Sequence, residues 1–321
     1  MSNMPSTSFS AVDGPSATAA SPRPFDYAVV DVFAERALEG NPLAVFSDAR
    51  GLSTKEMQAL ARETNLSETT FILPRGLEVE RERGVQVRIF TVEEELQFAG
   101  HPTLGTASWL YWNHPVLRGA EQITLELPVG PIPVRFNAPK PGERGVFGTM
   151  KQNDPTFGQI HERAPLAAAL GLSIDDLDSS VPAQTVSTGM AQCIVPLKSM
   201  AVAARLQVPQ QRSRTYLEST DAKFAYCITR ADAGSGADWH ARMQFYNGED
   251  PATGSAAGCA ISYLVRHGLV ASGQTIVIEQ GVEMLRPSRI HVSATIENSV
   301  VTKVFVGGRT IPVASGRFFL P

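Results

Sequence analysis

Two glycine-rich turns, one in each half of the chain, carry the strongest chemical signal in this sequence. The first reads Ala99-Gly100-His101-Pro102 and the second reads Thr253-Gly254-Ser255-Ala256, and small and apolar residues follow each of them. A glycine turn that opens a helix leaves free backbone N–H groups and the positive end of the helix dipole facing outward, where an anion can bind. Two such turns predict that two similar units hold one acidic small molecule. The donors would be Gly100, His101, Gly254 and Ser255.

Three ionisable residues near these turns are candidates for proton transfer. Glu68 stands where a strand is expected to begin, and apolar neighbours there can raise the pKa of its carboxyl, although a solvated glutamate is the simpler interpretation of that position. His101 can hold a proton or bond a substrate, or it can cap a helix. Asp250 can polarise a substrate group or orient the other two, or it can be a turn residue before a proline. Ser255 can donate its hydroxyl and N–H group, but its surroundings do not fit the pattern of a nucleophilic serine.

Short strands and two apolar helices are expected to position these residues. Ser53 and Glu56 form a capping box that opens a first helix. The helices after the glycine turns are expected over 103–112 and 255–266, and their apolar character indicates burial. Alternation and turn residues predict strands in the first half at 26–33, 43–46, 69–73, 86–90, 123–127 and 132–136. In the second half they predict strands at 146–150, 193–197, 224–229, 242–246, 275–280, 289–296, 301–306 and 316–320.

The order of these elements predicts two domains of the α+β class. Each half has strands around one buried helix, and the elements do not alternate as in a Rossmann fold. The segment 140–145 is the expected linker. Residues 1–25, rich in Ser, Ala, Thr and Pro, are expected to form a disordered tail. The first domain is then expected over 26–139 and the second over 146–309.

Composition excludes several classes of protein. The 321 residues carry a formal charge of −4, which gives no electrostatic basis for binding nucleic acid or an acidic membrane. The apolar runs are too short to cross a bilayer. Cys193, Cys227 and Cys259 form no close pair and no secretory signal is visible, so we expect a cytoplasmic protein, with Cys259 in a core. The histidines lack metal-ligand spacing, so no metal is expected.

Five segments of the chain, in order, resemble the PhzF-like family of phenazine-biosynthesis isomerases. These are 65–71, 88–91, 98–102, 249–256 and 280–283, and the likeness covers most of the chain from about Tyr27 onward. The resemblance implies the fold of diaminopimelate epimerase, in which two pseudo-symmetric domains, each a mostly antiparallel sheet wrapped around a central helix, enclose the active site. It further implies that the last strand, at about 310–321, returns to the first domain and that the protein is a homodimer.

The resemblance also implies an activity and the roles of individual residues. The family's reference reaction is the cofactor-free isomerisation of trans-2,3-dihydro-3-hydroxyanthranilate, in which a proton moves between carbons of a small carboxylated, unsaturated acid. The family's catalytic glutamate corresponds to Glu68, and the likeness favours His101 and Asp250 as its catalytic partners. The expected substrate-binding residues are Gly100, Gly254, Ser255, Ser67 and Asn41.

Two features depart from related proteins and bear on the reaction. Epimerases of this fold transfer protons with two cysteines at the glycine turns, where this chain has Ala99 and Thr253, so racemisation by two thiols is disfavoured. The segment 245–248 is shorter than in many members and lies where one wall of the substrate pocket is expected. Two alternatives stay open: an epimerase or lyase that uses the same proton abstraction on another acid, and a non-catalytic protein that binds a small acid. Arg88 can pair with an acidic ligand or face solvent.

Overall fold

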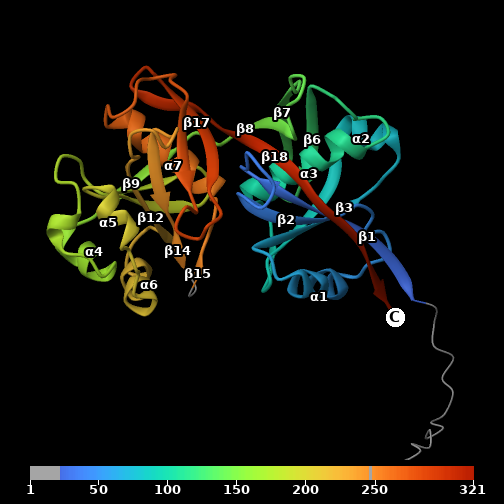
Figure 1. Cartoon of the computed structure of the whole chain (residues 1–321), viewed down its shortest axis with the longest axis horizontal. Helices are drawn as coiled ribbons and strands as arrows, with labels where there is room; N and C mark the ends of the chain where they lie inside the picture. The colour runs from blue at the N-terminus through green and yellow to red at the C-terminus, as the bar shows by residue number, and fades with distance from the viewer. Residues whose placement is uncertain (1–21, 246–247) are drawn as a thin grey trace, which may run out of the picture.

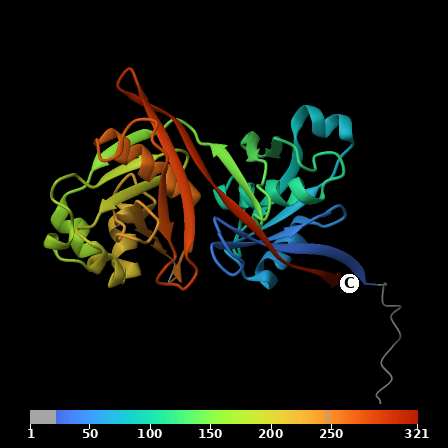
Figure 2. The same cartoon turned by 45° about the horizontal axis from the view of Figure 1, so that its top comes forward.

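The computed structural model describes residues 22–245 and 248–321 as two lobes joined by long strands (Figures 1 and 2). The first lobe contains β1–β7 with α1–α3, and the second contains β9–β17 with α4–α7. The strands β8 and β18 run between the two lobes (Figure 1). The C-terminus lies on the first lobe, beside the start of β1.

The elements of the first lobe are β1 (Arg23–Val32), β2 (Asn41–Phe46), α1 (Thr54–Thr64), β3 (Glu68–Leu73), α2 (Leu77–Arg83), β4 (Val85–Phe90), β5 (Glu95–Leu96), α3 (Gly100–Asn113), β6 (Gln122–Leu127) and β7 (Gly130–Asn137). Those that follow in the chain are β8 (Val146–Lys151), β9 (Thr156–Ile160), α4 (Arg163–Ala169), a 3-10 turn (Ile174–Asp176), β10 (Gln184–Ser187), β11 (Ala191–Pro196), α5 (Met200–Ala204), α6 (Gln210–Glu218), β12 (Phe224–Arg230) and β13 (Trp239–Arg242). The last are β14 (Gln244–Phe245), β15 (Gly248–Glu249), α7 (Gly254–Arg266), β16 (Ile276–Gln280), β17 (Ser288–Glu297) and β18 (Val300–Leu320).

A mostly antiparallel sheet runs through both lobes. Its order is β1-β2-β3-β4-β6-β7-β8-β18-β17-β16-β13-β12-β11-β10-β9, with parallel pairs at β2/β3, β4/β6, β11/β12 and β13/β16. The C-terminal part of β18 pairs with β1, from Thr310 opposite Val32 to Leu320 opposite Arg23. This pairing closes the first lobe into a barrel. The structure combines a large sheet with helices, and to this extent it confirms the predicted α+β class.

The helices α3 and α7 are the buried helices of the two lobes. Most residues of each are buried, and Leu104 and Leu110 of α3 belong to the same apolar core as Ile261 and Leu264 of α7. Removal of this apolar surface from water is the main force that holds each helix against its strands. The expected burial is therefore confirmed, although α3 begins at Gly100 and α7 at Gly254, earlier than the predicted starts at 103 and 255.

Several elements differ from the sequence prediction. Strand β1 begins at Arg23, inside the expected tail over 1–25, because Phe25 is buried in the core beneath α1; residues 1–21 lie outside the described residues. The strands expected at 301–306 and 316–320 are parts of one long strand, β18. The strand expected over 242–246 is divided between β13 and β14. The short helices α2 and α4–α6 and the strands β9 and β10 were not predicted, because segments of four to nine residues carry little periodic signal.

Gly105 permits the close approach of α3 to β1 and β2. A Cβ at this position would lie 2.6 Å from Leu43 Cδ2 and 2.7 Å from Val32 Cγ2. We expect Gly105→Ala to lower the free energy of unfolding by about 1–3 kcal/mol through overpacking, although alanine is the better helix former. Urea unfolding measures the change. The control Gly76→Ala, where nothing lies within 4 Å of the added Cβ, should cost less than about 1 kcal/mol; equal losses would contradict the packing argument.

Candidate active site

Two parallel strands of the first lobe begin side by side and place two of the predicted residues. Strand β2 begins at Asn41 and β3 at Glu68, and the register pairs Leu43 with Glu68. Neighbouring parallel strands bring their first residues to the same edge of a sheet. Asn41 is fully buried, and 18% of the Glu68 side chain is exposed. Ser67, just before β3, is exposed.

His101, the second residue of α3, faces Glu68. Its Nε2 atom lies 3.5 Å from Glu68 Oε2, which is longer than a normal hydrogen bond. Both atoms are buried, and neither has a hydrogen-bonding partner among the described residues. Asn41 Oδ1 is in the same condition. Because buried polar atoms are almost always paired in proteins, these three atoms mark a place where a bound molecule can supply the missing partners.

Asp250 reaches the same place from the second lobe. Asn41 Nδ2 donates a hydrogen bond to Asp250 Oδ1 over 2.8 Å, and it also donates to the backbone oxygen of Ala252 over 3.0 Å. Thr253 Oγ1 donates to Asp250 Oδ2 over 2.5 Å. The structure therefore brings the predicted residues Asn41 and Asp250 into direct contact, and the charge of Asp250 acts on Glu68.

The first turns of α3 and α7 meet across the boundary between the lobes. A Cβ on Gly100 would lie 3.4 Å from the backbone nitrogen of Ser255 and 3.6 Å from Gly254 Cα. The N-cap residues are Ala99 and Thr253, and over the described chain neither caps its helix with a side-chain hydrogen bond. The two helix starts therefore present their backbone N–H groups and positive dipole ends at one location, as the two glycine turns predict.

Burial gives the ionisable groups of the site unusual pKa values. Loss of hydration, with the nearby charge of Asp250, raises the pKa of Glu68 to about 8. Burial lowers the pKa of His101 to about 3, so its ring is neutral at physiological pH. Burial also raises the pKa of Asp250 to about 6, although the hydrogen bonds from Thr253 and Asn41 act to lower it. At neutral pH the site thus holds a mainly protonated Glu68 next to a mainly ionised Asp250.

Gln280 supports Asp250 through hydrogen bonds, a role that the sequence analysis did not assign to it. Its Nε2 atom donates to the backbone oxygen of Asp250 over 2.7 Å and to Thr253 Oγ1 over 3.0 Å. Its Oε1 atom accepts from Tyr226 Oη over 2.9 Å and from the Thr253 N–H group over 3.1 Å. The amide is thus saturated with hydrogen bonds. The one sequence signal was that Gln280 begins the last of the five family-like segments.

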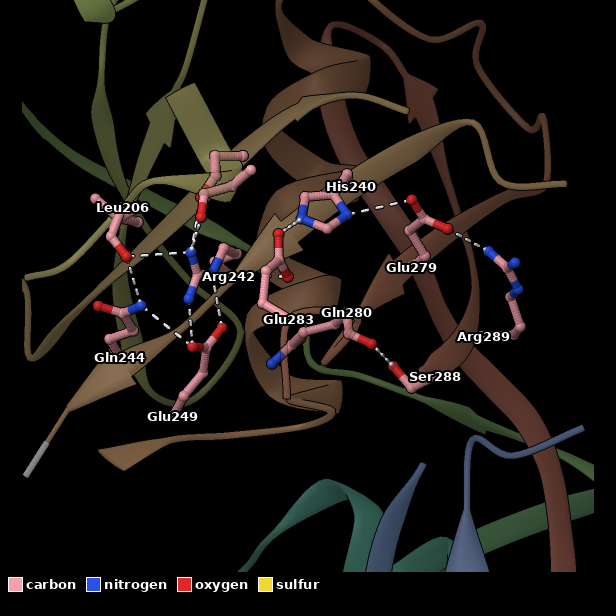
Figure 3. A network of polar contacts seen from close by, with 12 residues as sticks. Leu206, His240, Arg242, Gln244, Glu249, Glu279, Gln280, Glu283, Ser288 and Arg289 are labelled. Carbon is pink, nitrogen blue, oxygen red and sulfur yellow. Dashed lines mark hydrogen bonds and ion pairs between the residues drawn. The ribbon is translucent and has the colours of Figure 1, made fainter. Parts of the chain in front are cut away.

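A network of charged side chains joins β13 to β15, to β16 and to the segment after β16 (Figure 3). Arg242 forms a two-pronged ion pair with Glu249, the residue before Asp250, with distances of 2.8 and 2.6 Å. His240 lies between Glu279 and Glu283, at 3.2 and 3.0 Å (Figure 3). Burial alone would lower the pKa of His240, but hydrogen bonds to these two carboxylates raise it to about 9. The histidine is therefore a cation that links β13 to β16 and to the segment after β16.

Other residues singled out in the sequence lie in structural roles. Arg88 forms an ion pair with Glu95, with Nε–Oε1 at 2.7 Å. Cys259 is buried within α7, as expected, and the three cysteines are free. The short segment 245–248 connects the paired strands β14 and β15, and residues 246 and 247 within it lie outside the described residues.

Residues 22–245 and 248–321 contain neither a metal-binding cluster nor a membrane-spanning helix. In this part of the chain no three His, Cys, Asp or Glu side chains gather closely enough to hold a metal ion. No helix there has the length and apolar character needed to cross a bilayer.

Comparison with known proteins yields relatives along nearly the whole chain. The family model of phenazine biosynthesis-like proteins, PhzC-PhzF, matches residues 30–316. The trans-2,3-dihydro-3-hydroxyanthranilate isomerase of Pseudomonas aeruginosa is 37% identical over 301 residues, which are 92% of this chain and 99% of the relative. A PhzF-family protein of Bacillus anthracis is 26% identical with a TM-score of 0.80, and a predicted epimerase of Pseudomonas aeruginosa is 35% identical with a TM-score of 0.76; each likeness covers 92% of this chain and 99% of the other.

The pKa of Glu68 predicts how stability changes with pH. It rises from an ordinary 4.5 to about 8 on folding, so between these values the folded state binds more protons than the unfolded state and stability falls as pH increases. Glu68→Gln mimics the uncharged carboxyl. We expect the variant to lie within about 1 kcal/mol of the parent protein at pH 5 and to exceed its free energy of unfolding by on the order of 4 kcal/mol at pH 8.5, as measured by urea unfolding. A difference that does not change with pH would contradict the burial of this carboxyl.

Proposed function

This chain belongs to the phenazine biosynthesis-like protein family and is an isomerase, and we propose that it moves a proton between two carbons of a small carboxylated, unsaturated amino or hydroxy acid. The substrate we propose is trans-2,3-dihydro-3-hydroxyanthranilate, after which the Pseudomonas aeruginosa relative is named. One observation carries the proposal: Glu68 Oε2 and His101 Nε2 are buried and unpaired among the described residues, where two helix starts meet.

The proposed architecture of the site has two related domains. We assign them to 26–139 and 146–309, in the manner of diaminopimelate epimerase, with the end of β18 returning to the first. In support, each lobe has one buried helix that begins at a glycine, and Ala99 and Thr253 occupy the same N-cap position in the two helices. The homodimer expected from the family resemblance stays a prediction, which sedimentation of the purified protein would test.

In the proposed complex the substrate carboxylate binds to the two helix starts. The backbone N–H groups of Gly100, His101, Gly254 and Ser255 supply the donors. The positive ends of both helix dipoles favour an anion there, and burial strengthens this attraction because little water screens it. Asn41 Oδ1, which lacks a partner in the described structure, can accept a hydrogen bond from the substrate, and the exposed Ser67 lies at the rim.

Glu68 is the proposed acid and base of the reaction. As a carboxylate it removes a proton from a carbon next to an unsaturated system, and the electron pair of the broken C–H bond becomes delocalised. As a carboxylic acid it returns a proton to another carbon of that system, so atoms and electrons balance without an oxidant or reductant. A pKa of about 8 keeps both forms accessible near neutral pH, as general acid–base catalysis requires.

His101 and Asp250 are the proposed catalytic partners of Glu68. The neutral imidazole of His101 can donate or accept a hydrogen bond at the reacting system without adding charge. The mainly ionised Asp250 can hold a substrate amine or hydroxyl. A two-thiol epimerase mechanism has no support, because neither Ala99 nor Thr253 carries a thiol.

Replacement of Glu68 tests the proposed reaction. With trans-2,3-dihydro-3-hydroxyanthranilate as substrate, we expect Glu68→Gln to lower kcat by about 10²–10⁴-fold, because the amide cannot take up a proton. Glu63→Gln removes an exposed glutamate of α1 and should leave kcat unchanged. In deuterated water the parent protein should place deuterium on the carbon that gains the proton, as NMR of the product shows.

The same experiment separates the alternatives. Deuterium at the original carbon with inversion there would indicate an epimerase, and elimination of a substituent would indicate a lyase. Binding of the acid without turnover by the parent protein would indicate a non-catalytic binding protein. Near-normal turnover by Glu68→Gln would remove Glu68 from its role.

A further inference from the structure

A single arginine of the second lobe holds the turn that precedes Asn41. Arg286 lies between β16 and β17, and its Nη2 atom donates to Asp31 Oδ1 over 2.8 Å and to the backbone oxygen of Glu39 over 2.9 Å. Its Nε atom donates to the backbone oxygen of Gly40 over 3.0 Å. The planar guanidinium with its fixed fork of donors is suited to such a set of oxygens, which a lysine cannot match.

This turn has little freedom to move. Gly40 has a φ of +65°, and a Cβ on it would lie 2.3 Å from the backbone oxygen of Val32. Its N–H group donates to the backbone oxygen of Pro287 over 2.9 Å, so the turn is also held by the residue after Arg286. Asp31 is almost fully buried, and its Oδ2 atom accepts from the N–H group of Leu38 over 2.6 Å.

The loop that carries Arg286 also packs against the segment of Asp250. The N–H group of Arg286 donates to the backbone oxygen of Gly281 over 3.0 Å. A Cβ on Gly281 would lie 2.7 Å from the backbone oxygen of Pro251, the residue after Asp250. This loop of the second lobe therefore contacts Pro251, next to Asp250. Its arginine binds Gly40, next to Asn41.

We propose that Arg286 is a positioning residue for the isomerase: it fixes the turn at Gly40 so that the Asn41 amide meets Asp250 across the boundary between the lobes. Arg286 touches neither Glu68 nor Asp250 itself, and it acts through Asn41. This proposal deepens the proposed function, on which it rests for the role of Asp250.

The surroundings of Asp250 make its ionisation a direct measure of this contact. The charge of Glu249 from β15 acts to raise the pKa of Asp250, while hydrogen bonds from Asn41, Thr253 and the N–H group of Ala252 act to lower it. Glu68 from β3 has the higher pKa and is therefore uncharged where Asp250 titrates. Without the donor from Asn41, the buried carboxylate would keep Thr253 as its remaining side-chain donor beside the charge of Glu249. Its pKa would then rise.

Arg289 offers a matched control. Like Arg286 it pairs with a buried carboxylate, with Nη1 at 2.7 Å from Glu279 Oε2, and it donates to the backbone oxygen of Ser235 over 2.6 Å. The two arginine side chains are 26% and 28% exposed. The side-chain bonds of Arg289 stay within the second lobe, so its loss removes an equivalent ion pair without touching the turn at Gly40.

The experiment measures the pKa of Asp250 by NMR of aspartate labelled with ¹³C at the side-chain carboxyl, with the signal assigned through Asp250→Asn. We expect Arg286→Met and Asn41→Ala to raise this pKa by similar amounts and to lower kcat/KM about tenfold or more. The double variant should be no worse than Asn41→Ala, because both changes break the same contact. Arg289→Met should leave the pKa of Asp250 unchanged.

Two further variants keep the test decisive if Arg286→Met does not fold. Arg286→Met combined with Asp31→Asn removes both partners, so no buried charge is left alone. Arg286→Lys keeps the charge and loses the fork, and it should have an intermediate effect. An unchanged pKa of Asp250 in either folded variant, or additive losses with Asn41→Ala, would overturn the proposal. The NMR measurement needs no substrate. A failure of this proposal can therefore be distinguished from a failure of the proposed reaction, which the activity of Glu68→Gln tests.

Discussion

The site depends on keeping a carboxyl group and an imidazole out of water without giving them a protein partner. Glu68 Oε2 and His101 Nε2 are both in this condition in the described structure. Each such group costs about 1–3 kcal/mol, which is a substantial share of the net free energy of unfolding of a domain. The apolar core around α3 and α7 offsets this cost. The result is a glutamate with a pKa of about 8, which the proposed mechanism uses as acid and base.

Each lobe supplies half of the proposed site. The first lobe gives Glu68 and His101, and the second gives Asp250 with the start of α7. Glycines permit the close approach: a Cβ on Gly254 would lie 3.1 Å from Phe33 Cζ of the first lobe. The continuous strand β18 ties the lobes covalently and by hydrogen bonds, because it pairs with β17 in one and β1 in the other. The proposed chemistry therefore requires the contact between the lobes.

The sequence predicted those features that depend on interactions between residues close together in the chain. The capping box of Ser53 and Glu56 is present as expected, and the buried helices begin at their glycines. Glu68 was selected through family resemblance, because a glutamate at a strand end is usually solvated and nothing local shows that it is buried. Gln280 and Arg286 could not be found from residues alone, because their partners lie 27 to 255 positions away along the chain. Long-range polar contacts leave no periodic pattern in a sequence.

Two acidic residues share this site, and the distribution of hydrogen-bond donors decides which of them carries the proton. Asp250 receives donors from Asn41 and Thr253, so its pKa stays at about 6 in spite of burial. Glu68 Oε2 receives none from the described residues, and its pKa reaches about 8. Groups whose environments push their pKa values apart divide into an acid and a fixed charge. In the proposed mechanism, the residues that hold the donors on Asp250 therefore also leave Glu68 as the group that exchanges a proton with substrate. These residues are Gln280, which acts through Thr253, and Arg286, which we propose acts through Asn41.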